Sequence, residues 1–173
     1  MMKSEIMIVS DNHGATKLLA QMLDNHRDAD FFFHCGDSNL AAEHSLMKNF
    51  ICVKGNTDYM ERYPLYQYAK LTTGENVWIT HGHKQYVREK AAELISDTFT
   101  QKPIPDIVLY GHTHRVNAEM FQDVLFINPG SISQPRDGNP PSYAKLTITT
   151  TQYLVELYCA TENSILKEWR FPR

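Results

Sequence analysis

Five short apolar segments of the chain are each followed directly by a polar cluster, and this arrangement constrains the fold more than any other feature. Each cluster combines Gly or Thr with Asp, Asn or His. The clusters are Ser10-Asp11-Asn12-His13-Gly14, Gly36-Asp37-Ser38-Asn39, Gly55-Asn56-Thr57-Asp58, Thr80-His81-Gly82-His83 and Gly111-His112-Thr113-His114. In an open α/β sheet the carboxyl ends of parallel strands line one edge, where ligand sites form. We therefore expect the five clusters to converge on one cleft.

The first part of the chain alternates between strand and helix patterns. Short, apolar, β-branched runs predict buried strands at Glu5–Ser10, Phe31–Cys35 and Phe50–Lys54. Apolar residues at helical spacing predict helices over Ala15–His26 and Leu40–Asn49. Strand, helix, strand, helix, strand is the order of a parallel α/β sheet.

The second part becomes mostly β. We predict strands at Val77–Thr80 and Ile107–Tyr110, an amphipathic helix over Lys84–Thr98, and further strands over 116–121, 123–127, 143–149, 152–159 and 164–171. No repeat or linker divides the chain, so we expect one domain over residues 1–173. Two packed sheets covered by helices would accommodate both parts.

Overall charge argues against two classes of partner. Lys plus Arg (17) against Asp plus Glu (20) gives −3, so no general attraction to nucleic acid or anionic membrane is expected. Phosphate recognition must then come from a local cationic site. Three cysteines without paired spacing, Cys35, Cys52 and Cys159, lie in apolar runs, as suits a reducing compartment. With no signal peptide or membrane span in sight, we expect a cytoplasmic protein.

The residue types of the clusters are those of a metal centre. Carboxylate, imidazole and amide oxygen together suit divalent ions such as Mn²⁺, Fe²⁺, Zn²⁺ or Mg²⁺. A carboxylate between two such ions can bridge them, as two-metal phosphoryl-transfer sites require. Two ions beside two Asp carboxylates leave the site positively charged, so it would attract a phosphate ester despite the acidic chain.

The series D-x-H, G-D, G-N, H-G-H and G-H-T-H, in this order, resembles the calcineurin-like metallophosphoesterases, and is most similar to the small YfcE-like phosphodiesterases. The resemblance runs from Ser10 to beyond Gly130. It implies an α/β fold of four layers, an α/β/β/α sandwich of two mixed sheets flanked by helices. It also implies one metal held by Asp11, His13, Asp37 and His114, and a second held by Asp37, Asn56, His81 and His112. Asp37 would be the bridge. Mn²⁺ is the first expectation for both ions, with Zn²⁺, Fe²⁺, Ni²⁺ and Mg²⁺ as alternatives.

The remaining histidines receive plainer interpretations. His26, His34 and His44 are expected to be structural. His83 follows His81 by two residues, which leaves a supporting and a substrate-facing position open, and we place it with Asp37, Asn56 and His81 in the catalytic group.

Other polar residues near the motifs have supporting interpretations. Asn12 is expected to shape its turn, and Asp58 to support Asn56. Arg115 and Arg136 are candidate phosphate contacts, although an exposed Arg is usually only solvated. The nearby Tyr cluster (Tyr59, Tyr63, Tyr66 and Tyr68) favours packing or a subunit contact, and a homo-oligomer stays open.

One position departs from the family pattern. Many relatives carry His where this chain has Thr57, and that His is thought to protonate the leaving oxygen. Thr cannot do so at neutral pH, so we expect preference for phosphodiesters with good leaving groups. The expected mechanism is in-line attack of a metal-bridging hydroxide on phosphorus.

The function predicted is a metal-dependent phosphodiesterase acting on a small phosphate ester whose identity the sequence does not reveal. The rival is a phosphoesterase-like scaffold that binds proteins, as the related retromer subunit does. The complete set of seven ligands argues against the scaffold. A nuclease is a weaker option because no basic groove is evident.

Overall fold

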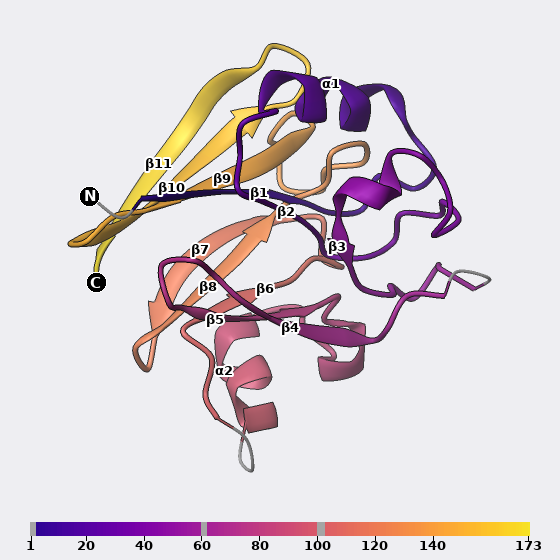
Figure 1. The fold of residues 1–173 in the computed structure, drawn as a ribbon. Helices are drawn as coiled ribbons and strands as arrows, with labels where there is room; N and C mark the ends of the chain where they lie inside the picture. The colour runs from indigo at the N-terminus through magenta and orange to yellow at the C-terminus, as the bar shows by residue number, and fades with distance from the viewer. Residues whose placement is uncertain (1–2, 60–61, 100–102) are drawn as a thin grey trace.

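Two sheets packed face to face form the centre of the molecule, with a helix on each outer face (Figure 1). The computed structural model describes residues 3–59, 62–99 and 103–173. Within these residues the first sheet has the order β11 (Ser164–Pro172), β10 (Gln152–Cys159), β9 (Ser142–Ile148), β1 (Ser4–Val9), β2 (Phe31–His34) and β3 (Ile51–Cys52). The second has the order β4 (Tyr66–Lys70), β5 (Asn76–Thr80), β6 (Ile107–Leu109), β8 (Val124–Pro129) and β7 (Val116–Phe121).

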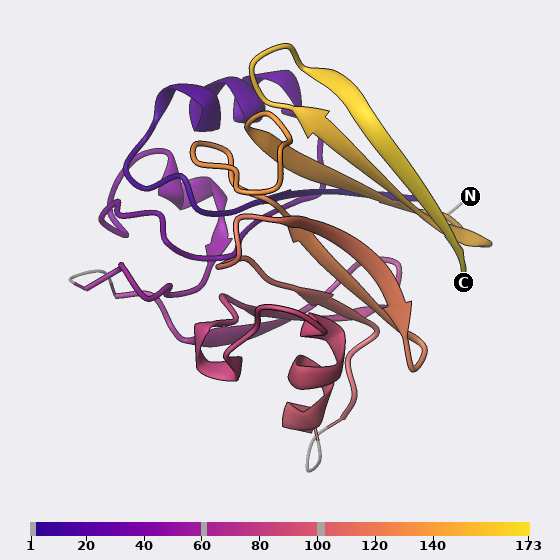
Figure 2. The ribbon, with the colours of Figure 1, turned by 180° about the vertical axis from the view of Figure 1, so that it is seen from behind.

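Alternation along the strands separates three layers of core. On β1, Ile6 and Ile8 face the second sheet, whereas Met7 and Val9 pack beneath α1 (Lys17–Asn25). This is the period of two expected for a strand buried on both faces. Helix α2 (Ala91–Ser96) covers the outer face of the second sheet, as the view from behind also shows (Figure 2). The four-layer sandwich predicted from the sequence is confirmed.

Parallel pairing brings the ends of five strands to one edge. In the first sheet β1, β2 and β3 run parallel, with Ile8 opposite Phe33 and His34 opposite Cys52. In the second sheet β5, β6 and β8 run parallel, with Ile79 opposite Leu109. Each of the five polar clusters begins within three residues of the end of one of these strands, so their loops share one rim of the sandwich.

Two predicted helices are wrong in extent. Only Met47–Asn49 of the predicted helix Leu40–Asn49 is helical, as a 3-10 turn. Local side chains compete with the helix there, because Leu40 N donates to Ser38 Oγ (3.2 Å) and Leu46 N donates to His44 Nδ1 (3.2 Å).

The predicted helix Lys84–Thr98 is divided into a 3-10 turn at His83–Gln85, α2, and a 3-10 turn at Asp97–Phe99. Tyr86 and Lys90 both have φ of +53°, which interrupts any continuous helix between the first turn and α2. The other predicted elements agree with the structure to within about two residues, except that β3 is shorter, which is the usual uncertainty of boundaries.

Strand β4 was not predicted. It forms the edge of the second sheet, and its side chains alternate between exposed and half-buried, with Tyr66 and Tyr68 on the exposed face. None of the described helices is long and apolar enough to cross a membrane.

Candidate metal centre

All seven predicted ligands lie at the shared rim, on the loops that follow β1, β2, β3, β5 and β6. The loop after β1 carries Asp11 and His13, and the loop after β6 carries His112 and His114. The other three loops supply one residue each: Asp37, Asn56 and His81. The strands that precede these loops are far apart in the sequence, so only the packing of the two sheets brings the seven residues together.

Asp11 lies at the middle of the group and one of its oxygens has no hydrogen-bond donor. The residue is fully buried. Its Oδ2 accepts hydrogen bonds from Ser10 Oγ (2.6 Å) and from His112 N (3.1 Å). Its Oδ1 accepts none from the described residues, yet lies 3.2 Å from His114 Nε2 and 3.9 Å from the Nε2 atoms of His13 and His81. A buried carboxylate oxygen left without a donor is costly unless a cation faces it.

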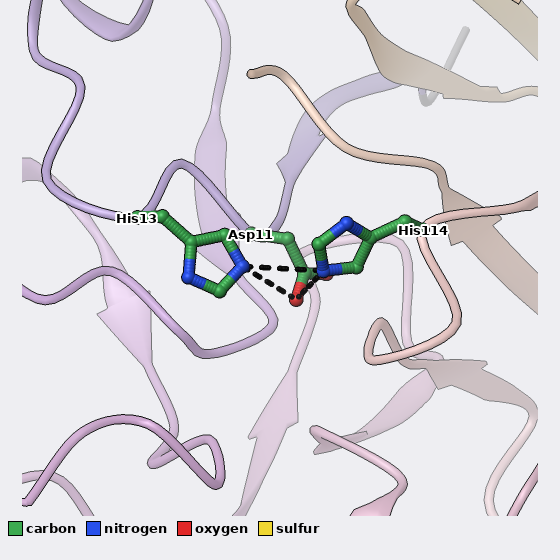
Figure 3. A group of neighbouring side chains, drawn as sticks. All are labelled: Asp11, His13 and His114. Atoms are coloured by element: carbon green, nitrogen blue, oxygen red, sulfur yellow. Dashed lines mark hydrogen bonds and ion pairs between the residues drawn. The ribbon is translucent and has the colours of Figure 1, made fainter. Parts of the chain in front are cut away.

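His13 and His114 present ring nitrogens to the same point (Figure 3). His114 Nδ1 lies 2.7 Å from the carbonyl oxygen of Gln134, which can only accept, so this nitrogen carries the proton. His13 Nδ1 likewise faces Asn39 Oδ1 at 3.1 Å. Each neutral ring then directs an Nε2 lone pair inward, and the two Nε2 atoms are 3.2 Å apart. Two lone pairs and an anionic oxygen around one point fit a bound cation.

A second group of acceptors surrounds His81. Its Nδ1 donates to the carbonyl oxygen of Cys35 (2.7 Å), so its Nε2 is the free nitrogen. That Nε2 lies 3.3 Å from Asp37 Oδ2 and 3.1 Å from Asn56 Oδ1. Asn56 Oδ1 is also 2.9 Å from His112 Nδ1, so His112 turns the other ring nitrogen toward this group. The donor set again suits a divalent cation.

Asp11 is common to the two compact groups, which are Asp11 with His13 and His114, and Asp11 with Asp37 and His81. The resemblance gives the bridging role to Asp37 instead, and that assignment stays a prediction.

Electrostatics at the centre favour positive charge. Burial alone would raise the pKa of Asp11 and Asp37, but hydrogen bonds and charge from His114 and His81 outweigh it and lower both pKa values. Burial would likewise lower the pKa of His81 and His114, but the facing carboxylates raise both instead. Protons therefore compete with a cation for these two rings.

The backbone is strained at most of the predicted ligands. Asp11, His13, Asp37, His112 and His114 all have φ between +45° and +71°, a region that costs a non-glycine residue about 1–2 kcal/mol. Two glycines are required beside them. A Cβ at Gly111 would collide with Ser10 Oγ, and one at Gly55 would collide with Asp37 Oδ1. Such strain at five of the seven predicted ligands is typical of a functional site rather than of packing alone.

Asp58 holds the loops in place. Its buried carboxylate accepts backbone hydrogen bonds from Asp37 (2.7 Å), Gly55 (2.8 Å) and Asn39 (2.8 Å). It therefore supports the loop of Asp37 and, through Gly55 N, the backbone next to Asn56. Sequence analysis did not identify Asn39, which accepts from His13 and donates to Thr57 O (2.8 Å). Asn39 lies in the G-D-S-N motif, which could have indicated a role at the site, but Asn at this position is equally typical of a turn.

Thr57 and His83 lie at the rim, and neither is placed to protonate a leaving group near pH 7. Thr57 N donates to Asp37 Oδ1 (2.8 Å), and its hydroxyl oxygen accepts from Asn39 Nδ2 (3.0 Å), so Thr57 positions the loop. The His83 ring centroid is 5.4 Å from that of His81. Burial, with charge from His81 and Lys84, lowers the pKa of His83 to about 4, so this ring is neutral near pH 7. A neutral imidazole is a weak general acid.

His34 and Asn12 have structural roles. The ring of His34 donates from Nε2 to Asn12 Oδ1 (2.8 Å) and accepts at Nδ1 from Gly36 N (3.1 Å). Asn12 then donates to Ala15 O (3.0 Å), which closes the turn. The Ser131 hydroxyl donates to Asp11 O (2.8 Å).

Comparison with known proteins gives the same family along most of the chain. Residues 4–151 match the model of the calcineurin-like phosphoesterase superfamily domain. The chain is similar to "Probable metallophosphoesterase YsnB" of Bacillus subtilis, with 31% identity over 163 residues that cover 92% of this chain and 94% of that protein. A crystal structure of a predicted phosphoesterase from Streptococcus pneumoniae TIGR4 aligns with a TM-score of 0.87 and 30% identity, covering 100% and 99% of the two chains.

Two more distant structures share the fold alone. The phosphoesterase YfcE of E. coli aligns with a TM-score of 0.68 and 22% identity over 95% of this chain and 98% of its own. Wild-type Vps29 of Entamoeba histolytica, solved in complex with Zn²⁺, aligns with a TM-score of 0.73 and 20% identity over 97% and 98%.

Proposed function

Because the chain belongs to the calcineurin-like phosphoesterase superfamily, we propose that it is a hydrolase that cleaves phosphodiesters with two divalent cations held at the rim of the sandwich. The observation that carries the proposal is the pair of acceptor groups around Asp11 and His81. Buried oxygens and imidazole lone pairs face one another there at 3.1–3.3 Å, an arrangement that only protons or cations can stabilise.

The two cations have distinct proposed ligands. Asp11, His13 and His114 would hold the first, together with Asp37, and the rest of the set would hold the second, with Asp37 shared. The first coordination set is fixed from outside by Asn39 and Gln134 O, and the second by Cys35 O. Mn²⁺ is the proposed metal, with Zn²⁺, Fe²⁺, Ni²⁺ and Mg²⁺ as the alternatives that the same ligands accept.

Bound cations would lower the pKa of water and place positive charge opposite the phosphoryl oxygens. The residues of the chain do the rest. Asp11 and Asp37 remain ionised down to low pH and so stay available as ligands. His112 is only half-buried and lies at the mouth of the site, where it can contact the substrate. Catalytic roles are proposed for Asp37, Asn56, His81 and His83.

The leaving group receives no dedicated acid in this proposal. Thr57 is engaged with Asn39 and Asp37, and His83 is neutral near pH 7. Aryl phosphodiesters, whose leaving groups need little protonation, are therefore the proposed preferred substrates over alkyl monoesters.

The experiment that tests the function compares metal-loaded protein with two matched variants on bis(4-nitrophenyl) phosphate and 4-nitrophenyl phosphate. Asp37→Asn is expected to abolish turnover of both. Asp30→Asn, which alters an exposed carboxylate that accepts from Glu5 N, is expected to keep wild-type activity. Equal activity of Asp37→Asn and wild type, or no turnover by Mn²⁺-loaded wild type, would contradict the proposal.

A protein-binding scaffold is the second candidate, supported by the fold shared with Vps29. Since that structure contains Zn²⁺, metal binding alone does not separate the two candidates. Turnover does, because a scaffold would show none with any of the five metals. The chain is further proposed to be one cytoplasmic domain over residues 1–173, in keeping with its buried free cysteines Cys35, Cys52 and Cys159.

A further inference from the structure

A cavity of about 430 Å³ opens beside the metal centre and is lined by three arginines. Arg88, Arg115 and Arg136 line it together with His112 and a single carboxylate, Glu89. Its volume lies within the range of small-molecule sites. Of the seven proposed ligands only His112 contributes, so the cavity lies next to the metal centre rather than over it.

The three guanidinium groups are unengaged. No ion pair or side-chain hydrogen bond joins Arg88, Arg115 or Arg136 to another residue within ranges 3–59, 62–99 and 103–173. Elsewhere three arginines do have carboxylate partners: Arg27 with Asp24, Arg170 with Glu168, and Arg173 with Glu75. Three unpaired guanidinium groups around one cavity, opposed by one carboxylate, make a local cationic site on a chain whose net charge is −3.

The arginines come from three loops that are tied to the metal centre. Arg136 N donates to His114 O (3.0 Å), and Arg115 N donates to Thr113 Oγ1 (3.2 Å). Arg88 follows Val87, whose buried side chain anchors that loop beside Gly82. The cavity therefore keeps a defined position relative to His112 and His114.

We propose that this cavity binds a second phosphate of the substrate, so that the preferred substrates are phosphodiesters carrying a further phosphate group. The inference rests on the proposed function and adds the substrate class. Guanidinium groups match phosphate oxygens through paired N–H donors, and three of them suit a dianion better than a carboxylate. The metal centre itself would take the scissile diester.

The test uses two substrates that differ only in that group: thymidine 5′-(4-nitrophenyl phosphate) with and without a 3′-phosphate. Metal-loaded wild type is expected to have a kcat/KM about tenfold higher for the 3′-phosphorylated substrate, the size expected from a few partly exposed ion pairs. In the variant Arg88→Gln/Arg115→Gln/Arg136→Gln this ratio is expected to fall to about one, and by about twofold in each single variant. The variant Arg27→Gln/Lys48→Gln/Arg170→Gln removes the same charge at a distance and is expected to keep the wild-type ratio.

A binding measurement gives a readout that does not need turnover. Calorimetry on metal-loaded protein is expected to show thymidine 3′,5′-bisphosphate binding about tenfold more tightly than thymidine 5′-phosphate, and equal binding of the two by the triple arginine variant. Equal binding by wild type would overturn the second-phosphate site, whatever the activity. An equal loss on both substrates in the triple variant would also overturn it, since the arginines would then bind the scissile phosphate. Absence of turnover with the binding preference intact would instead count against the proposed function alone.

Discussion

Replacing Asp58 by Asn should show how much the candidate metal centre depends on the residue that supports its loops, because Asp58 is not itself a proposed ligand. The Asp58 carboxylate is fully buried and accepts three backbone N–H groups at 2.7–2.8 Å. An amide keeps one oxygen, which can still accept from Asp37 N and Gly55 N. Its NH₂ group must then face the N–H of Asn39, where neither group can accept.

The cost of Asp58→Asn follows from that geometry. One buried N–H left unsatisfied costs about 1–3 kcal/mol, and the other two bonds lose the assistance of the charge. We expect the free energy of unfolding to fall by about 2–4 kcal/mol. Because the loop that carries Asp37 loses its anchor at Asn39 N, metal affinity should fall about 10–100-fold.

Urea unfolding and Mn²⁺ titration measure the two effects, with Asp30→Asn as the matched control. Asp30 also accepts a backbone N–H, from Glu5 (2.8 Å), but it is exposed and lies at the far end of β1. Its substitution should cost under about 1 kcal/mol and leave metal affinity unchanged. An Asp58→Asn protein with the stability and metal affinity of wild type would refute the reasoning.

Three further outcomes are expected. Removing metal with a chelator should lower the free energy of unfolding by about 2.7 kcal/mol relative to protein held at 100 times its metal Kd, and a melting temperature independent of metal would contradict this. Across a series of phosphodiester leaving groups, kcat/KM should depend steeply on leaving-group pKa, and Thr57→His should flatten the dependence. A flat profile in wild type would show that position 57 has another role. Burial lowers the pKa of His34 from 6.5 to about 4, so the unfolded chain binds the proton that folded His34 excludes. Its contribution to the free energy of unfolding should therefore be complete above pH 6.5 and fall as pH drops toward 4, by about 1 kcal/mol per pH unit. The difference between wild type and His34→Gln across this range measures that contribution, and a constant difference would contradict it.

The sequence by itself predicted most of the strands and the residue types of the candidate site, and its motifs implied the four layers through the family resemblance. The strands and the residue types depend on local information. Short apolar runs such as that around Ile8 are typical of a buried strand. The side chains of Asp11, His81 and His114 are of the types that bind divalent metals. Because parallel strands end at a common rim, placing these residues after strands was enough to predict that they converge.

Only the tertiary structure decided how each side chain is presented. His81 turns Nε2 inward because Cys35 O accepts from Nδ1, and His112 turns Nδ1 inward instead, choices made by partners distant in sequence. The Asp58 carboxylate likewise accepts from backbone donors of one distant loop, that of Asp37 and Asn39, and from Gly55 in its own loop. The helix expected after Leu40 was lost to side chains that bind nearby backbone, a competition that helical periodicity does not report.

The sequence also did not predict the cationic cavity. The sequence indicated Arg115 and Arg136 only as separate candidate phosphate contacts, and it gave no reason to single out Arg88. Their meeting depends on the three loops being anchored around His112 and His114. Long-range packing of the two sheets brings those loops together, and no local sequence pattern encodes that distance.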